Sequence, residues 1–272
     1  RSRHHRRSFA RSASPPPSAI ADCHIIRHHL FTPGGDPVTL DDVMADLEAH
    51  GSESTKKVLV KHGAREPFFG VKVDHLKTIV KKVKRDHALA LALYDTGNSD
   101  AMYLASYLSD PAKFTKAQLN KWVKGAYWHY LSCFAVPWAA AESRFGRELA
   151  LEWMGSKKEQ TAAAGWSTYT SLLSITPDED LDHAEITDLL ARVLRDIHAA
   201  PNRAKAAMNT FVIAVGTYVP ALTAKAKATA KAVGKVEVDV GDTSCQVPDA
   251  AASIDKVIAA GRHGKKRKSV RC

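Results

Sequence analysis

A histidine and a cysteine, two residue types that often do chemistry in proteins, lie one helical turn apart at His129 and Cys133. At this i, i+4 spacing their side chains can meet on one face of a helix, which would suit a thiolate–imidazole pair or two ligands of a metal ion. Neither residue has a recognised third partner, and cysteine is also common in helical cores. Two roles therefore remain open for His129 and Cys133: a reactive or metal-binding pair, or buried packing in a helical core.

Lysine and arginine residues form groups that could contact a phosphate backbone. Lys77, Lys81 and Lys84 make one row at i, i+4, i+7, opposite the apolar positions of a predicted helix. Arg203 and Lys205 lie at the start of another predicted helix, where unpaired N–H groups attract anions. DNA is the partner that these groups predict, and a solvated helix surface is the alternative for the lysine row.

Large aromatic side chains are concentrated in the middle of the chain. Trp122, Tyr127, Trp128 and Tyr130 fall within nine residues, and Trp166 follows later. In a groove between helices, indole rings could stack on bases or hold a cationic base. The alternative is that the rings fill the space between helix layers. If the first holds, we expect Trp128 and Trp166 to contact DNA.

Several common chemistries have no local motif in this sequence. GxGxxG, GxxxxGK[ST], HExxH and GxSxG are all missing, which leaves dinucleotide, P-loop, zincin and hydrolase sites without support. No set of His and Cys residues has familiar metal-ligand spacing, and the four cysteines form no CxxC pair. We therefore expect no metal and no cofactor. The longest apolar run has seven residues, so we also expect no membrane span.

Helical periodicity dominates residues 39–261. Apolar residues recur at i, i+3, i+4, i+7 from Leu40 to Leu47 and in three later stretches, and Thr39 fits an N-cap. Glycine and proline divide the rest into short helices. One candidate for extended structure is the segment 236–240, a short strand or an extended turn. We predict an all-α protein of about eleven helices, stacked as antiparallel pairs in a HEAT-like α-solenoid.

The net positive charge of the chain comes from its two ends, because acidic residues balance the Lys and Arg residues between them. We expect residues 1–38, rich in Arg and Ser, to be a disordered basic segment with the composition of a targeting peptide. Residues 262–272 carry +6, as in a nuclear signal or a nucleic-acid-attracting arm. The full chain carries +10 but residues 31–261 carry −1, which excludes a uniformly basic body. An organelle or the nucleus is the expected location if the ends are signals, and the cytoplasm otherwise.

Short stretches in a distinctive order span residues 39–262. They include GVKVDHLK at 70–77, AGW at 164–166, NRAKAAMN at 202–209, GKVEVD at 234–239 and GDTSC at 241–245. Together they resemble the DNA alkylation repair enzyme family. The resemblance implies a HEAT-like solenoid with a concave groove that faces DNA. Active members are glycosylases that remove cationic N3- and N7-alkylated purines without flipping the base into a pocket. In them Trp side chains and an Asp stabilise the positive charge that develops on the sugar.

The functional residues implied by the resemblance carry over only in part. Trp128 matches a Trp of the family's Trp-then-Asp helix, while the Asp position falls on Ser132 or Cys133. The arginines that grip the backbone would fall at 160–165, which reads QTAAAG, and a later Trp falls near Thr210 or Phe211. The catalytic residue is therefore unknown, and the missing groups weigh against glycosylase chemistry.

Three functions remain open from the sequence. The first is a monomeric DNA-binding HEAT-like protein related to alkylation repair, with weak or no glycosylase activity, acting on duplex DNA with or without alkylation. The second is an alkylpurine DNA glycosylase with relocated catalytic groups. The third is an α-solenoid scaffold for protein or RNA. The resemblance, the basic groups and the Trp cluster favour the first, whereas the near-neutral body favours the third.

Overall fold

The computed structural model describes residues 38–271, and all regular structure in this range is helical. The predicted basic segment 1–38 therefore lies outside the described residues, Val38 excepted. The thirteen α-helices are α1 (Leu40–Ala49), α2 (Glu53–Lys61), α3 (Val73–Val83), α4 (His87–Asp95), α5 (Ser99–Leu108), α6 (Lys116–Gly125), α7 (Val136–Ala141), α8 (Gly146–Met154), α9 (Glu159–Ile175), α10 (His183–Asp196), α11 (Asn202–Tyr218), α12 (Thr223–Val233) and α13 (Ala250–Ala259). A π-helical turn, Leu131–Ala135, leads directly into α7. The all-α prediction is confirmed.

The described residues form two more helices than the predicted eleven. Helix α2 is short and has no buried residue. Helix α7 has six residues and carries Pro137 in its first turn, directly after the π-helical turn. Where a cap is present the prediction holds: Thr39 caps α1, and its Oγ1 accepts the N–H of Asp42 at 3.2 Å.

The segment 236–240 is an extended turn without a partner strand in the described part of the chain. It belongs to the long connection 234–249 between α12 and α13. Val236 is buried and Val238 packs against the same core, while Glu237 and Asp239 are exposed. The alternating pattern in the sequence thus reflects burial on one side of an extended segment.

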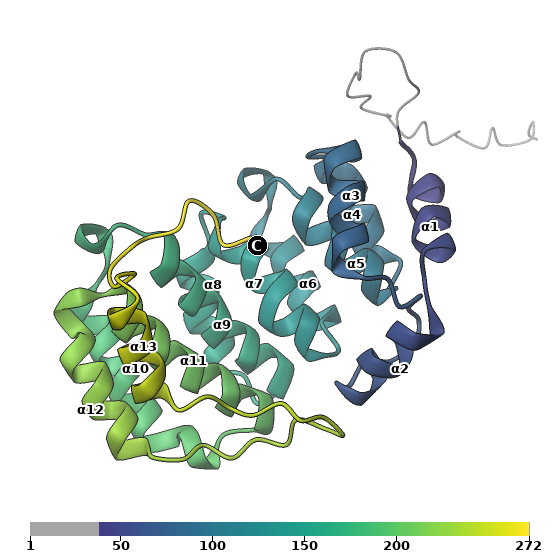
Figure 1. The fold of residues 1–272 in the computed structure, drawn as a ribbon. Coiled ribbons are helices and arrows are strands. Elements are labelled where there is room, and N and C mark those ends of the chain that lie inside the picture. Colours follow the sequence, from purple (N-terminus) through teal and green to yellow (C-terminus); the bar gives the residue numbers. More distant parts are fainter. Residues whose placement is uncertain (1–37, 272) are drawn as a thin grey trace, which may run out of the picture. The chain divides into compact units, whose positions relative to one another are not determined.

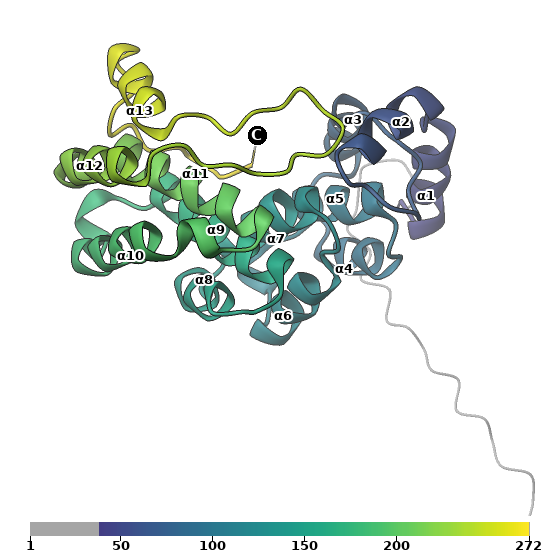
Figure 2. The ribbon, with the colours of Figure 1, turned by 90° about the horizontal axis from the view of Figure 1, so that it is seen from below.

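The helices stack in two rows, as predicted for an α-solenoid. Figure 2 shows α4, α6, α8, α10 and α12 along one row and α5, α7, α9 and α11 along the other. Helix α4 packs on α5, α8 on α9, and α11 on both α9 and α12. The row of α5, α7, α9 and α11 is called the inner row here, because the connection 234–249 runs along its side of the molecule (Figure 2).

The apolar core has two parts that meet at α9. One part extends from α1 to α9 and the other from α8 to α13. Helix α9 contributes Ala164 and Leu172 to the first part and Trp166 and Tyr169 to the second. The position of α9 therefore sets how the two halves of the solenoid are joined.

A close crossing of α8 and α9 occurs at Gly165. A Cβ atom at this position would lie 2.7 Å from the carbonyl oxygen of Ala150 and also too close to the backbone N of Met154. The preceding residues, Ala162 to Ala164, are small and buried as well. The stretch QTAAAG thus lets two backbones approach each other, and this packing explains its composition.

The basic C-terminal residues, predicted to be a nuclear signal or a nucleic-acid-attracting arm, are bound to the helices. The Arg267 N–H donates to the Ser174 carbonyl oxygen at 2.7 Å, and Val270 is 1% exposed. Arg271 forms an ion pair with Glu142 at 3.3 Å, with its side chain 10% exposed. The tail runs beside the inner row toward α7 (Figure 1) and forms one compact unit with the helices.

Within residues 38–271, no single helix has the length and apolar composition needed to cross a bilayer. Helix α11 and the segment Pro220–Val233 meet that test only when taken together, and the chain bends by 115° between them.

Replacement of Gly165 by Ala tests the helix crossing. We expect Gly165→Ala to lower the free energy of unfolding by about 1–3 kcal/mol, because the added methyl group meets backbone atoms that cannot turn away. The matched control is Gly155→Ala, where the nearest atom to the new Cβ lies at 3.4 Å. Urea denaturation followed by circular dichroism measures both. Equal stability of the two variants would contradict the close crossing.

Candidate nucleic-acid interface

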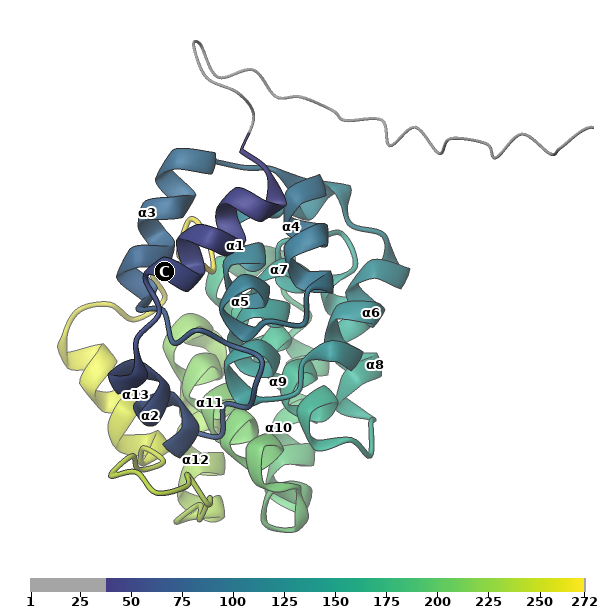
Figure 3. The same ribbon diagram turned by 90° about the vertical axis from the view of Figure 1, so that its right-hand side faces the viewer.

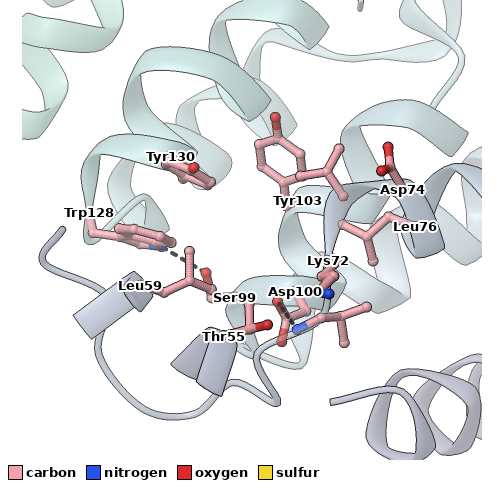
Figure 4. A pocket seen from close by; sticks show the side chains of 12 residues that line it. Thr55, Leu59, Lys72, Asp74, Leu76, Ser99, Asp100, Tyr103, Trp128 and Tyr130 are labelled. Carbon is pink, nitrogen blue, oxygen red and sulfur yellow. Dashed lines mark hydrogen bonds between the residues drawn. The ribbon is translucent and has the colours of Figure 1, made fainter. Parts of the chain in front are cut away.

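Two cavities open among the residues that the sequence analysis singled out. The first, about 320 Å³, lies among α2, the start of α3, α5 and residues 128–130 (Figure 4). The second, about 370 Å³, lies among the π-helical turn, α7, α9, α11 and the C-terminal tail. The second cavity therefore borders the inner row, and Tyr130 and Phe134 connect the two by an edge-to-face contact at 5.8 Å.

The first cavity contains a carboxylate that is engaged in holding the fold. Asp100 Oδ2 accepts the N–H groups of Phe69 at 2.7 Å and Gly70 at 2.9 Å, and Oδ1 accepts that of Val71 at 3.4 Å. Burial raises the pKa of Asp100, although these backbone hydrogen bonds oppose the shift. Gly70 has φ +79°, a conformation that favours glycine. Asp100 thus fixes the turn before α3 and is not free to act on a ligand.

The tryptophans act mainly as core residues. Trp128 is 3% exposed; its Nε1 donates to Ser99 Oγ at 2.7 Å and its ring stacks on Tyr130 at 4.6 Å. Figure 4 shows Trp128 and Tyr130 side by side at one wall of the first cavity. Trp166 is 2% exposed against Phe211 and lines neither cavity. Packing thus accounts for both residues, and we leave Trp166 out of the proposed interface.

Phe134, in the π-helical turn that leads into α7, is an exposed aromatic residue that the sequence analysis did not single out. It is 40% exposed, lines the second cavity and lies between Tyr130 and Trp138, with both ring distances at 5.8 Å. Its position four residues after Tyr130 was the available signal. The exposure of a side chain cannot be read from that spacing, so the sequence did not distinguish Phe134 from a buried aromatic residue.

The predicted lysine row has two helical members. Helix α3 ends at Val83, and Lys84 lies beyond it with φ 62°. Lys77 and Lys81 are on the helix, but none of the three lines either cavity. Lys205, predicted to bind DNA with Arg203, is also outside both linings. As DNA contacts these lysines remain predictions.

Arg203 faces the second cavity with its side chain. Its backbone N–H donates to Glu159 Oε1 at 3.1 Å, so the predicted anion site at the start of α11 is already filled by a carboxylate. The guanidinium lines the cavity together with Arg267 of the tail. Between residues 38 and 271, no carboxylate forms an ion pair with the Arg203 side chain. This side chain is therefore a positive group available to a ligand.

His129 and Cys133 line the same cavity, as their spacing predicts. Burial lowers the pKa of His129 to about 4, and the positive charge of Arg203 adds to the shift. Burial raises the pKa of the Cys133 thiol, and this effect exceeds the opposing influence of Arg203. Both groups are thus neutral at pH 7, which disfavours a thiolate–imidazole pair.

At each of the two positions where the family resemblance leaves two residues open, one residue of the pair lines the second cavity and the other is buried. Ser132 is fully buried, and its Oγ donates to Gln160 Oε1 at 2.6 Å, whereas Cys133 lines the second cavity. At the later position Thr210 lines the cavity and Phe211 is fully buried. Cys133 and Thr210 are thus the members of these two pairs that face the second cavity.

The second cavity has a positive and hydroxyl-rich lining. Its polar side chains are His129, Cys133, Ser167, Thr170, Ser171, Ser174, Arg203, Thr210, Tyr218 and Arg267. No aspartate or glutamate is among the described residues that line it. Such a lining can bind an anion through guanidinium and hydroxyl groups, but it supplies no negative charge to stabilise a cation.

Comparisons with known proteins match this chain over most of its length. The family model described as DNA alkylation repair enzyme matches residues 43–233. The uncharacterized protein Lin0241 of Listeria innocua is 32% identical over 225 residues, which cover 80% of this chain and 97% of the relative. The uncharacterized protein Lmo0209 of Listeria monocytogenes is 31% identical with the same coverage.

A solved structure is similar in fold as well as in sequence. It is described as a new family of proteins related to the HEAT-like repeat DNA glycosylases with affinity for branched DNA structures. The TM-score is 0.80 and the identity 40%, over 86% of this chain and 100% of that chain. The predicted HEAT-like solenoid is thus confirmed.

The protonation state of His129 tests the electrostatics of the second cavity. We expect its imidazole to titrate near pH 4 by NMR, with the signal assigned by loss in His129→Gln. Arg203→Ala should raise this midpoint, because it removes a positive charge. The pKa of His129 in the folded chain lies below its value of about 6.5 in the unfolded chain, so the unfolded chain binds more protons at any pH between about 4 and 6.5. The free energy of unfolding should therefore fall as the pH drops from about 6.5 to 4. A midpoint at or above 6.5 would contradict the burial.

Proposed function

Because this chain belongs to the DNA alkylation repair enzyme family, we propose that it binds DNA, branched DNA included, along its inner row, with weak or no glycosylase activity. The affinity for branched DNA in the description of the 40% identical structure supports this proposal. The observation that carries it is the second cavity, which combines two arginines and several hydroxyl groups with no carboxylate in its lining.

A phosphate group fits the lining of the second cavity. A guanidinium can form two parallel hydrogen bonds to one phosphate, and Ser and Thr hydroxyls are common phosphate donors in DNA complexes. Arg203 and Arg267 border a wall that carries the hydroxyls of Ser167, Thr170 and Ser171. Contacts of this kind position a DNA backbone without reading its sequence.

Phe134 gives this surface a means to prefer a branch point. Bases next to a branch are less completely stacked than bases inside a duplex, and an exposed aromatic ring can stack on them. Phe134 is 40% exposed and is supported by Tyr130 and Trp138. We therefore expect Phe134 to contribute to the preference for branched over linear DNA.

The same cavity disfavours removal of alkylated purines. Loss of such a base builds positive charge on the sugar, which a carboxylate would stabilise. Cys133 lines the cavity, and burial raises the pKa of its thiol, so this group stays uncharged at pH 7. Arg203 would in addition repel a cationic alkylated base.

DNA affinity tests the interface. We expect the full chain to bind a fluorescent four-way junction more tightly than a linear duplex of the same sequence, with affinity falling as salt rises. Arg203→Ala should weaken binding by about 10-fold and reduce the slope of log affinity against log salt by about 1.

Phe134→Ala should reduce the preference for the junction more than the affinity for duplex. Light scattering of the free chain should give a monomer.

The matched control for Arg203→Ala is Arg195→Ala, on α10 of the other row, where the arginine pairs with Asp196 at 2.8 Å. It removes the same charge away from the inner row and should leave junction binding nearly unchanged. Equal losses in the two variants would contradict the placement of DNA. A full chain that binds no DNA would favour the scaffold function.

Glycosylase activity is tested separately with methylated DNA. We expect purine release by the full chain at the background rate, because no described carboxylate lines the cavity. The measurement is chromatography of released bases, with DNA incubated without protein as the control. Release well above background would favour the second function, a glycosylase with relocated catalytic groups.

A further inference from the structure

Three potential metal ligands converge where α1 lies beside α3, and none of them lines either cavity. Asp46 lies on α1, His50 is the residue that caps its C-terminal end, and His75 lies on α3. Asp46 Oδ1 is 2.9 Å from His50 Nδ1 and 2.8 Å from His75 Nε2. One ligand atom from each residue lies within 4.8 Å of the other two. The adjacent helices are visible in Figure 3.

We propose that Asp46, His50 and His75 form a site for one divalent transition-metal ion, of the zinc, cobalt or nickel type. Two imidazoles and a carboxylate suit these ions, with solvent filling the remaining positions. Ligand atoms about 2.9 Å apart correspond to neighbouring corners of an octahedron with bonds of about 2.0–2.1 Å. The observed separations of 2.8 and 2.9 Å match that spacing.

The two imidazoles contact the same carboxylate oxygen but stack face to face, with ring centroids 3.6 Å apart and an interplanar angle of 16°. Because an imidazole nitrogen binds a metal through a lone pair in the ring plane, the exposed His50 ring has to turn out of the stack before both nitrogens can coordinate one ion. His50 Nδ1 also lies 2.9 Å from the main-chain oxygen of Asp46. In the metal-free chain, protons on the two ring nitrogens mediate these contacts. An ion would replace them, because a coordinating imidazole nitrogen must carry no proton.

The location suits entry and retention of a cation. The side chains are 51% exposed for His50, 29% for Asp46 and 22% for His75, so the site can be reached from solvent and is partly enclosed. The C-terminal end of α1 carries the partial negative charge of the helix dipole, which favours a cation there.

The metal would connect the first helix to the rest of the solenoid. Helix α1 buries only Val43 and Leu47, a small apolar contact for an end helix. Asp46 and His75 are 29 residues apart in the chain, so an ion bound by both would link two separate helices. No metal site was predicted from the sequence, because no set of ligands there has familiar spacing and His75 lies far from Asp46 and His50 in the chain.

Metal binding is tested with Co²⁺ and Zn²⁺ as probes. The full chain is used, with the potential ligands outside the described residues replaced by Gln or Ser in every sample: His4, His5, Cys23, His24, His28, His29 and Cys272. We expect one equivalent of Co²⁺ to bind with visible absorption bands, to be displaced by Zn²⁺, and to raise the melting temperature in proportion to the logarithm of metal concentration.

His75→Gln and Asp46→Asn should each weaken Co²⁺ binding by about 10-fold or more and remove the thermal shift. The matched control is His62→Gln, because His62 caps α2 as His50 caps α1 but lies outside the cluster. Far-UV circular dichroism checks that each variant is folded. Absence of saturable binding, or binding unchanged in both His75→Gln and Asp46→Asn, would overturn the proposal. Binding lost equally in His62→Gln would overturn it too.

Discussion

The crossing of α8 and α9 at Gly165 is the contact on which the arrangement of the two halves depends. Here a helix with three consecutive alanines and a glycine lies against the backbone of its partner, so that no side chain separates them. Helix α9 then provides apolar side chains to both parts of the core. Because its opposite side carries Ser167, Thr170 and Ser171, the same helix also forms a wall of the second cavity. Any shift of α9 would alter the packing of the halves and the cavity together.

The stretch QTAAAG also explains how a family scaffold can carry a different surface. The resemblance places backbone-gripping arginines in this stretch, whereas here the residues are used for close packing and Gln160 accepts a hydrogen bond from Ser132. Positive charge at the cavity comes instead from Arg203 on α11 and Arg267 in the tail. The positively charged side chains at the cavity thus lie on the neighbours of α9 and not in its first turns, while the helix stacking is retained.

Two segments without regular structure reinforce the inner row. The connection 234–249 is held at the start of α11, where Asn202 Oδ1 accepts the N–H of Asp239 at 2.7 Å, and it reaches α2 through the ion pair of Asp242 with Lys61 at 3.1 Å. The tail is held by Glu142, which accepts the N–H of Val270 at 3.0 Å. These hydrogen bonds and this ion pair fix two segments that form no helix or strand of their own.

The sequence by itself determined the all-helical class, the capping of α1 and the common location of His129 and Cys133, because helical period, caps and i, i+4 spacing are local properties. It also indicated the HEAT-like family through the order of short stretches. Only the tertiary structure decided which rings are exposed, that the basic tail is bound, and that His75 meets the end of α1. Those outcomes depend on contacts between residues far apart in the chain, and burial, charge and distance there are set by how the helices stack.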